Sequence, residues 1–140
     1  MLTRRLFLGS TLATLCSWPA RAQVAAAPEF RVIEARPAGL RLRPDAEIAA
    51  LGYDGQVPGP LLRVKKGQEV RVRLVNRLDQ PTSLHWRGVR IDNVMNGVAG
   101  LTQKAVAPGG SFDYRFTPPD PGFFVFHPHC DGAGGQIARG

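Results

Sequence analysis

An all-β fold, an antiparallel sandwich or barrel, is predicted by three features of this sequence. Two runs of residues alternate apolar and charged side chains with the two-residue period of a β-strand. Glycine and proline, with 16 and 12 of the 140 residues, divide the rest of the chain into short segments. After the first 22 residues, no segment shows the 3.6-residue apolar period of a long helix. Short strands separated by turns are typical of packed antiparallel sheets.

The two alternating runs predict strands with one face in a core. Residues 70–74 place two valines and a leucine on one face and two arginines on the other. Residues 112–116 place three aromatic side chains opposite an aspartate and an arginine. Successive side chains of a strand point to opposite faces, so each run buries its apolar members on one side.

The first 22 residues have the composition of an export signal. A basic pair, Arg4-Arg5, precedes an apolar stretch over residues 6–18, and Ala20-Arg21-Ala22 follows as a small-residue cleavage site. A membrane anchor is the alternative, but this stretch is shorter than the ~20 residues that a spanning helix needs. The segment TRRLFL also resembles a twin-arginine signal. We therefore expect periplasmic export by the twin-arginine route and no membrane span after signal removal.

These boundaries predict one folded domain. Residues 1–22 are the signal peptide, 23–29 an alanine-rich flexible leader, and 30–140 the domain. The net charge of +7 falls to +4 when the three signal arginines are removed. The remaining basic residues are spread along the chain, which is typical of solvated strand faces, and we expect no nucleic-acid partner. Cys16 leaves with the signal, and Cys130 then has no cysteine partner within the chain.

The histidines are the residues of this sequence that indicate a metal site. All three histidines lie in two strand-like segments: His85 in TSLHWRG, and His127 and His129 in FFVFHPH. Residues i and i+2 of a strand share a face, so His127 and His129 are expected to point the same way and to face His85 across the sandwich. Neutral imidazole favours copper or zinc over calcium or magnesium. The alternative for each histidine is a partly buried, hydrogen-bonded structural residue.

The order of motifs resembles the N-terminal cupredoxin domain of the multicopper oxidases. The resemblance covers about residues 30–140 and rests on four segments, which are YDGQVPGPLLRVKKGQEVRVRLVNRL, LHWRG, GLTQKAVAPGGSFDYRFTPPDPG and FHPH. It implies a cupredoxin-like Greek-key β-sandwich. It also implies a share in a trinuclear copper cluster, where the family reduces oxygen to water with ligands from its first and last domains.

The resemblance assigns copper ligands residue by residue. His85 matches the family's ligand to the type 2 copper, and His127 and His129 match ligands to the two type 3 coppers. Arg87 stands where the pattern His-Trp-His-Gly has its second histidine. Because arginine stays protonated and has no lone pair for a metal, we expect one type 3 copper to lose a ligand and gain a neighbouring cation.

Other positions also depart from the family pattern. Asn96 stands where aspartate is common, and Phe123 and Val125 stand where a small residue and an aromatic are usual. Cys130 is not expected to be a blue-copper ligand, because neither histidine nor methionine follows it. Met95 is interpreted as an apolar loop residue. These departures put catalysis in doubt and leave the fold prediction unchanged.

The sequence ends where the family continues into a closing strand and further cupredoxin domains. We therefore expect a sandwich without its last strand, and a fragment that is inactive alone. Its expected partners are copper ions and the missing C-terminal cupredoxin domains or a separately encoded chain. Two alternatives remain open: a non-catalytic exported cupredoxin-like scaffold, and a small periplasmic copper-binding protein that uses the three histidines as one mononuclear site.

Overall fold

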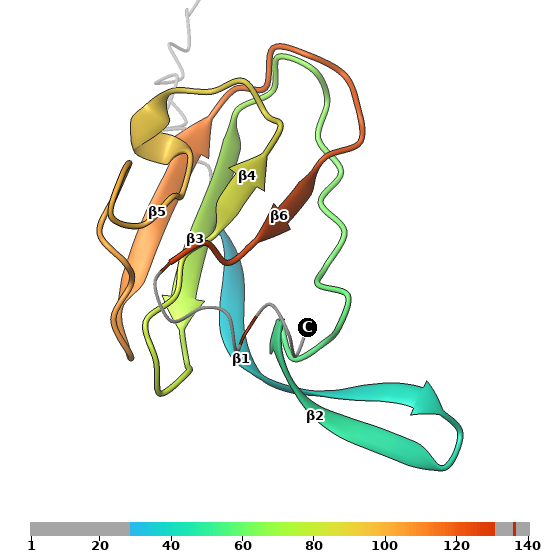
Figure 1. Cartoon of the computed structure of the whole chain (residues 1–140). Helices are drawn as coiled ribbons and strands as arrows, with labels where there is room; N and C mark the ends of the chain where they lie inside the picture. Colours follow the sequence, from blue (N-terminus) through green and yellow to red (C-terminus); the bar gives the residue numbers. More distant parts are fainter. Residues whose placement is uncertain (1–28, 131–135, 137–140) are drawn as a thin grey trace, which may run out of the picture.

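The computed structural model of the 140-residue chain describes residues 29–130 and Gln136 (Figure 1). The predicted signal peptide and nearly all of the predicted leader lie outside these residues. The elements of the described part are β1 (Arg31–Arg43), β2 (Ala46–Tyr53), β3 (Val70–Asn76), β4 (His85–Arg87), the 3-10 helix η1 (Asn93–Met95), β5 (Ser111–Phe116) and β6 (Val125–His127). No helix of this part is both long and apolar enough to cross a membrane.

The strands form two sheets, and the all-β prediction is confirmed. The larger sheet has the order β2-β1-β3-β5, and β4 pairs with β6 in a second sheet. In Figure 1 the β4–β6 pair lies in front of the larger sheet. The fold is therefore two-layered, with a four-stranded layer behind a two-stranded one in the described residues.

One strand pair runs parallel, which the alternation pattern did not predict. β1 pairs in parallel with β3 from Arg31↔Val72 to Ala35↔Asn76, whereas the other ladders are antiparallel. The chain reaches β3 through the β1–β2 hairpin and the long segment 54–69. Alternation fixes which face of a strand is buried but carries no information about strand direction.

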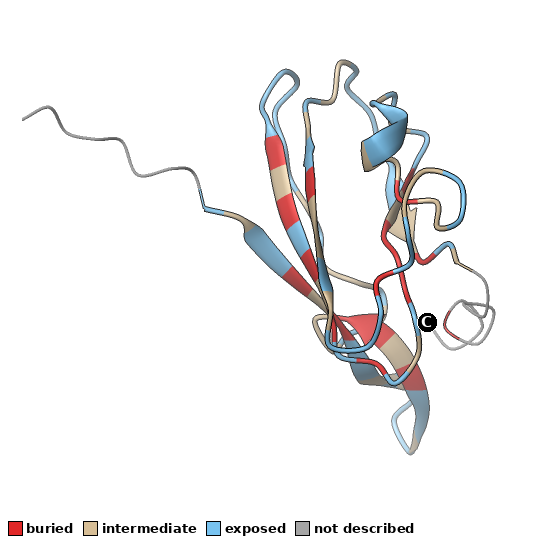
Figure 2. Ribbon diagram, turned by 90° about the vertical axis from the view of Figure 1, so that its left-hand side faces the viewer, coloured by how far each residue is buried: buried red, intermediate tan, exposed pale blue. Residues whose placement is uncertain are grey.

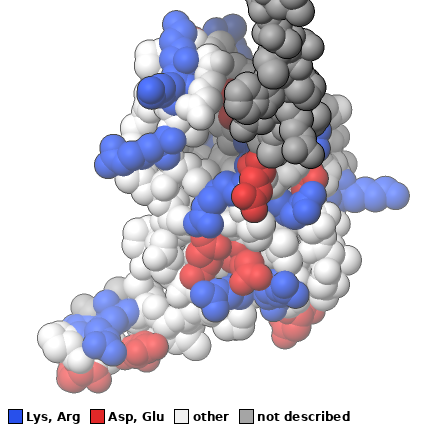
Figure 3. Space-filling model, turned by 180° about the vertical axis from the view of Figure 1, so that it is seen from behind, with Lys and Arg blue, Asp and Glu red and all other residues white. Residues whose placement is uncertain are grey.

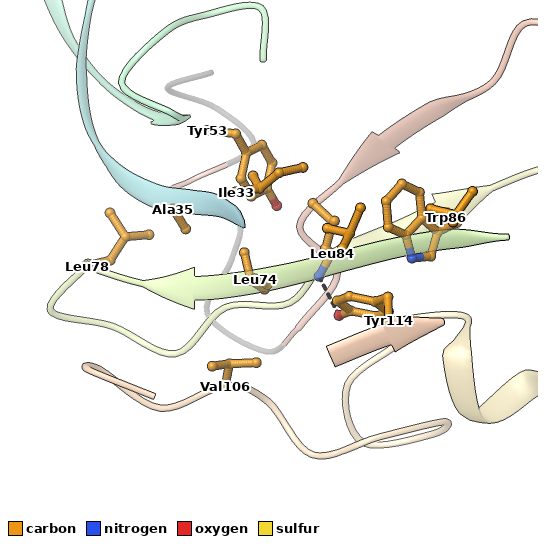
Figure 4. Packing of buried hydrophobic residues seen from close by; sticks show 11 residues of the cluster. Ile33, Ala35, Tyr53, Leu74, Leu78, Leu84, Trp86, Val106 and Tyr114 are labelled. Carbon is orange, nitrogen blue, oxygen red and sulfur yellow. Dashed lines mark hydrogen bonds between the residues drawn. The ribbon is translucent and has the colours of Figure 1, made fainter. Parts of the chain in front are cut away.

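The core lies between the two sheets (Figure 4). Val72 and Leu74 of β3 and Tyr114 of β5 contribute from the larger sheet, and Trp86 of β4 contributes from the smaller one. Buried residues alternate with partly or fully exposed ones along β3, as predicted for residues 70–74 (Figure 2). The smaller sheet is therefore attached to the larger one by packing rather than by a shared ladder.

The β1–β2 hairpin extends beyond the rest of the larger sheet (Figure 1). β1 pairs with β3 only up to Ala35, while its ladder with β2 continues to Arg43↔Ala46. Ile48, opposite Leu40 in this ribbon, is 50% exposed. The far end of the hairpin, residues 36–49, which we call the exposed ribbon, therefore adds little to the core.

Acidic and basic side chains are interspersed on the back of the molecule (Figure 3). Arg73 of β3 pairs with its cross-strand neighbour Asp113 of β5, at 2.6 and 2.8 Å. Arg77 and Glu34 form another ion pair, at 3.2 Å. The charged faces predicted for β3 and β5 thus face solvent and pair with each other.

Candidate metal centre

His85 and His127 are direct neighbours on the β4–β6 sheet. They are Cα partners in the antiparallel register, and their ring centroids lie 5.1 Å apart. The expectation that His85 faces the other histidines across the sandwich is therefore wrong. Sequence spacing does not reveal which strands pair, and here the two histidine segments are paired within one layer.

His129 joins this pair from just beyond the end of β6. Its ring centroid lies 5.3 Å from that of His85 and 5.8 Å from that of His127. The buried Pro128 separates the two histidines of β6 and its continuation. The structure thus brings together all three histidines predicted from the sequence, which we call the histidine cluster.

Two rings of the cluster are fixed by backbone carbonyls. Nδ1 of His85 lies 2.9 Å from the carbonyl oxygen of Asn96, and Nδ1 of His127 lies 2.8 Å from that of Pro128. A carbonyl oxygen only accepts, so each Nδ1 carries the proton and donates it. Each neutral ring then presents the lone pair of Nε2. Metal-binding histidines commonly donate their second nitrogen to such a partner.

The loop after η1 holds β4 in place. The carbonyl oxygen of Asn96 accepts a hydrogen bond from the Trp86 backbone N–H at 3.1 Å, besides the one from His85. The next residue, Gly97, has φ of +88°, and a Cβ there would overlap the carbonyl oxygen of Leu84. Glycine is therefore needed for this loop to lie against β4.

The backbone of His129 is held from both sides. Its N–H donates to Oγ of the buried Ser83 at 3.0 Å, and its carbonyl accepts from the N–H of Ala99 at 2.9 Å. The Ser83 carbonyl in turn accepts from the hydroxyl of Tyr53 at 2.9 Å. Burial raises the pKa of Tyr53 far above its usual value, so this hydroxyl stays protonated as a donor.

Aromatic packing holds β4, which carries His85, against β5. Trp86, between His85 and Arg87 on β4, contacts Phe116 at 4.9 Å and Tyr114 at 5.6 Å between ring centroids. The Leu84 N–H donates to the Tyr114 hydroxyl at 3.1 Å (Figure 4). Burial raises the pKa of Tyr114 to about 12. β4 is thus anchored to β5 immediately beside His85.

The donor set of the histidine cluster fits copper, because neutral imidazole nitrogens suit this metal. Within residues 29–130 and 136, however, no three His, Cys, Asp or Glu side chains are arranged as the ligands of a single ion. The imidazoles are close together without surrounding one common point.

Three of the four positions that depart from the family pattern are exposed. Arg87 is exposed on β4, opposite Val125 of β6, which is 49% exposed. Phe123 is 86% exposed. Asn96 contributes its backbone carbonyl to His85, and no hydrogen bond of its side chain is recorded in the described part.

The sulfur atoms of Cys130 and Met95 contact backbone groups outside the histidine cluster. Cys130 directs Sγ toward the carbonyl oxygen of Pro81, at 3.5 Å, and lines an open hollow that none of the three histidines lines. Sδ of Met95 accepts the backbone N–H of Arg115, at 3.4 Å. That neither serves a blue-copper site stays a prediction.

Sequence reasoning missed Ser83, Gly97 and the carbonyl of Asn96. Each contact involves a backbone atom of at least one partner, and such contacts leave no pattern in side-chain type. Gly97 has a positive φ, and the Asn-Gly pair at 96–97 is the sequence signal that could have indicated a turn there.

Comparison with known proteins finds similarity to multicopper oxidases. The family model described as Multicopper oxidase matches residues 40–140. The multicopper oxidase MmcO of Mycobacterium tuberculosis is 45% identical over 82 residues, and a copper resistance protein A homolog of Pseudomonas syringae pv. tomato is 42% identical over 80 residues. These matches cover 59% and 57% of this chain but only 16% and 14% of the two relatives.

The solved structure of a multi-copper oxidase from Pseudomonas thermotolerans is similar in fold. It superimposes with a TM-score of 0.74 and 41% identity, over 83% of this chain and 28% of that one. A structure from Pseudomonas parafulva, also a multi-copper oxidase, gives a TM-score of 0.72 and 36% identity over 80% of this chain. The two-layered fold is therefore the cupredoxin-like fold of these proteins, as predicted.

Proposed function

Because this chain belongs to the multicopper oxidase family, whose cofactor is copper, we propose that it is the copper-binding N-terminal domain of an exported oxidase. His85, His127 and His129 supply part of a trinuclear copper site. The reaction to which this site contributes is the reduction of oxygen to water.

The observation that carries this proposal is the convergence of three imidazole rings, with centroids 5.1–5.8 Å apart. The Nδ1 contacts of His85 and His127 with carbonyl oxygens add to it, because they leave Nε2 as the donor. When bound, copper supplies the one-electron chemistry that the imidazoles themselves lack. The carbonyl of Asn96 would orient the His85 ring that holds the metal.

Competent turnover requires ligands that the described residues do not supply. Arg87 occupies the position of the expected fourth histidine and offers no lone pair. The curated relatives are much longer than the segment matched here. We propose that further cupredoxin domains or a separate chain complete the cluster and bring the copper that accepts electrons from the reducing substrate.

Copper titration of the chain tests this proposal. We expect binding to the wild-type protein, and a loss of affinity of at least about tenfold on His85→Ala or His127→Ala, since each removes one imidazole donor. Cys130→Ser is the matched control and should bind copper like the wild type. Binding that survives both histidine substitutions but disappears with Cys130→Ser would assign the metal to the thiol instead.

A second measurement separates the domain from a complete oxidase. The chain alone should show no oxygen-dependent oxidation of phenols or of cuprous ion. Measurable turnover by the purified chain would contradict its role as one part of a larger site. If it binds no copper at all, a non-catalytic cupredoxin-like scaffold, which the presence of Arg87 also fits, becomes the better account.

Export is part of the same proposal. The basic pair Arg4-Arg5 and the apolar stretch after it support a twin-arginine route to the periplasm. Replacing both arginines by lysine should retain the protein in the cytoplasmic fraction. Unchanged periplasmic recovery of this variant would contradict the twin-arginine route.

A further inference from the structure

Arg87 places a cation on the face of the sheet that carries His85. The two residues are separated by Trp86 on β4, and residues i and i+2 of a strand project to the same side. His127 lies directly opposite His85. The guanidinium therefore extends from the same side of the β4–β6 sheet as two members of the histidine cluster.

No described acidic side chain neutralises this cation. Arg87 is exposed, and its side chain forms no ion pair, hydrogen bond or ring contact with the described residues. Its cross-strand neighbour is the apolar Val125. By contrast, Arg90, three residues further on, is held by Asp120 through two contacts of 3.1 Å.

The histidines proposed to bind copper beside Arg87 are also uncharged. Imidazoles that bind through Nε2 remain neutral, so they leave the charge of a bound copper ion uncompensated. A guanidinium close to that ion adds to the positive potential. Its planar fork of N–H donors matches a small oxyanion with two oxygen atoms, such as a carboxylate or bicarbonate.

We propose that Arg87 forms a subsite for a small monovalent oxyanion beside the copper ion held by the histidine cluster. The anion accepts hydrogen bonds from the guanidinium and offsets the charge of the metal. This inference rests on the proposed copper binding and adds a function to the position where a fourth histidine was expected.

Azide and formate are suitable probes of this subsite in the copper(II)-loaded chain. Azide bound to copper(II) gives a charge-transfer absorption band, and formate should displace it by competition. We expect Arg87→Gln to weaken both anions about tenfold, because it removes a charge-assisted hydrogen bond. Arg87→Lys should restore more of the azide affinity than of the formate affinity, since lysine keeps the charge without the fork.

Arg90→Gln is the matched control, since it removes an exposed arginine that is already paired with Asp120. Copper content, measured first, should be the same in all of these variants. Azide and formate affinities that do not change in Arg87→Gln would overturn the subsite while leaving copper binding intact. An equal loss in Arg90→Gln would also overturn it, because it would indicate general surface charge. Failure of the wild-type chain to bind copper would overturn both proposals.

Discussion

The two sheets of this protein are built in different ways. The larger sheet has ladders of five to eight residue pairs and a buried face formed by alternating strands. The β4–β6 sheet has three residue pairs, yet it carries two members of the histidine cluster. Because so short a ladder cannot fix side chains by itself, the cluster depends on the packing of Trp86 against Phe116, which holds β4, and on hydrogen bonds to loop carbonyls. Stability and site geometry are therefore separable in this fold.

The largest expected effect is in the core of the larger sheet. Leu74 on β3 is fully buried, and Leu74→Ala should lower the free energy of unfolding by about 2–5 kcal/mol through lost burial and a cavity. Urea denaturation measures this change. The control is Ile48→Ala on the exposed ribbon, where we expect less than about 1 kcal/mol. Equal costs at the two positions would contradict the assignment of the core to this sheet.

A smaller effect on stability, but a larger one on the site, is expected at Gly97. Gly97→Ala introduces an unfavourable positive φ and an overlap with the Leu84 carbonyl, at a cost of about 1–3 kcal/mol, and it displaces the carbonyl that orients His85. Gly100→Ala is the matched control, because its φ is also positive, at +82°, while the space around it is open. Copper affinity should fall in the first variant and not in the second. If both variants bind copper equally, the loop does not position His85.

Ser83→Ala should have a more local effect. It removes the acceptor of the His129 N–H and should cost about 1 kcal/mol. Amide hydrogen exchange at His129 should become faster, while exchange in β3 stays unchanged. Ser111→Ala, at an exposed position on β5, provides the control. Unchanged exchange at His129 would show that Ser83 does not hold this residue.

The smallest effect is expected on the solvent face of the larger sheet. The hydrogen bond from Arg73 lowers the pKa of Asp113 below its usual value. A carboxyl group whose pKa is lowered in the folded state stabilises the protein above its unfolded pKa, near 4, and loses this contribution as the pH falls through the folded pKa. Arg73→Gln should raise the pKa of Asp113 in an NMR titration and weaken the stability gain above about pH 4. An unchanged Asp113 pKa would contradict the pairing, and Arg41→Gln on the exposed ribbon should leave it unchanged.

The larger sheet could be predicted only in part from the sequence. Residues 70–74 and 112–116 alternate clearly, and both became strands. The expected face of the first is buried, whereas of the three aromatic residues in the second Tyr114 is buried and Phe112 and Phe116 are partly buried. The β1–β2 hairpin was not predicted, because Pro37 and Gly39 interrupt any alternation and much of the ribbon is exposed. Strand pairing depends on the whole chain, so the parallel β1–β3 ladder left no local pattern.

The histidine cluster was predictable for a different reason. Three histidines confined to two strand-like segments indicated convergence, and the family motif indicated copper. The motif did not reveal that His85 and His127 are cross-strand neighbours, nor that carbonyls of Asn96 and Pro128 fix their rings. These features arise from backbone positions, to which residue type is a weak guide.

The most direct test of the central claim is long-range proton–nitrogen NMR of the histidine rings, which shows which ring nitrogen carries the proton. Without metal, His85 and His127 should carry the proton on Nδ1 and leave Nε2 unprotonated. Addition of copper(I), which is diamagnetic, should shift Nε2 of both rings. Protonated Nε2 atoms, or Nε2 signals that copper(I) leaves unmoved, would contradict the account of the β4–β6 sheet as a copper-binding surface.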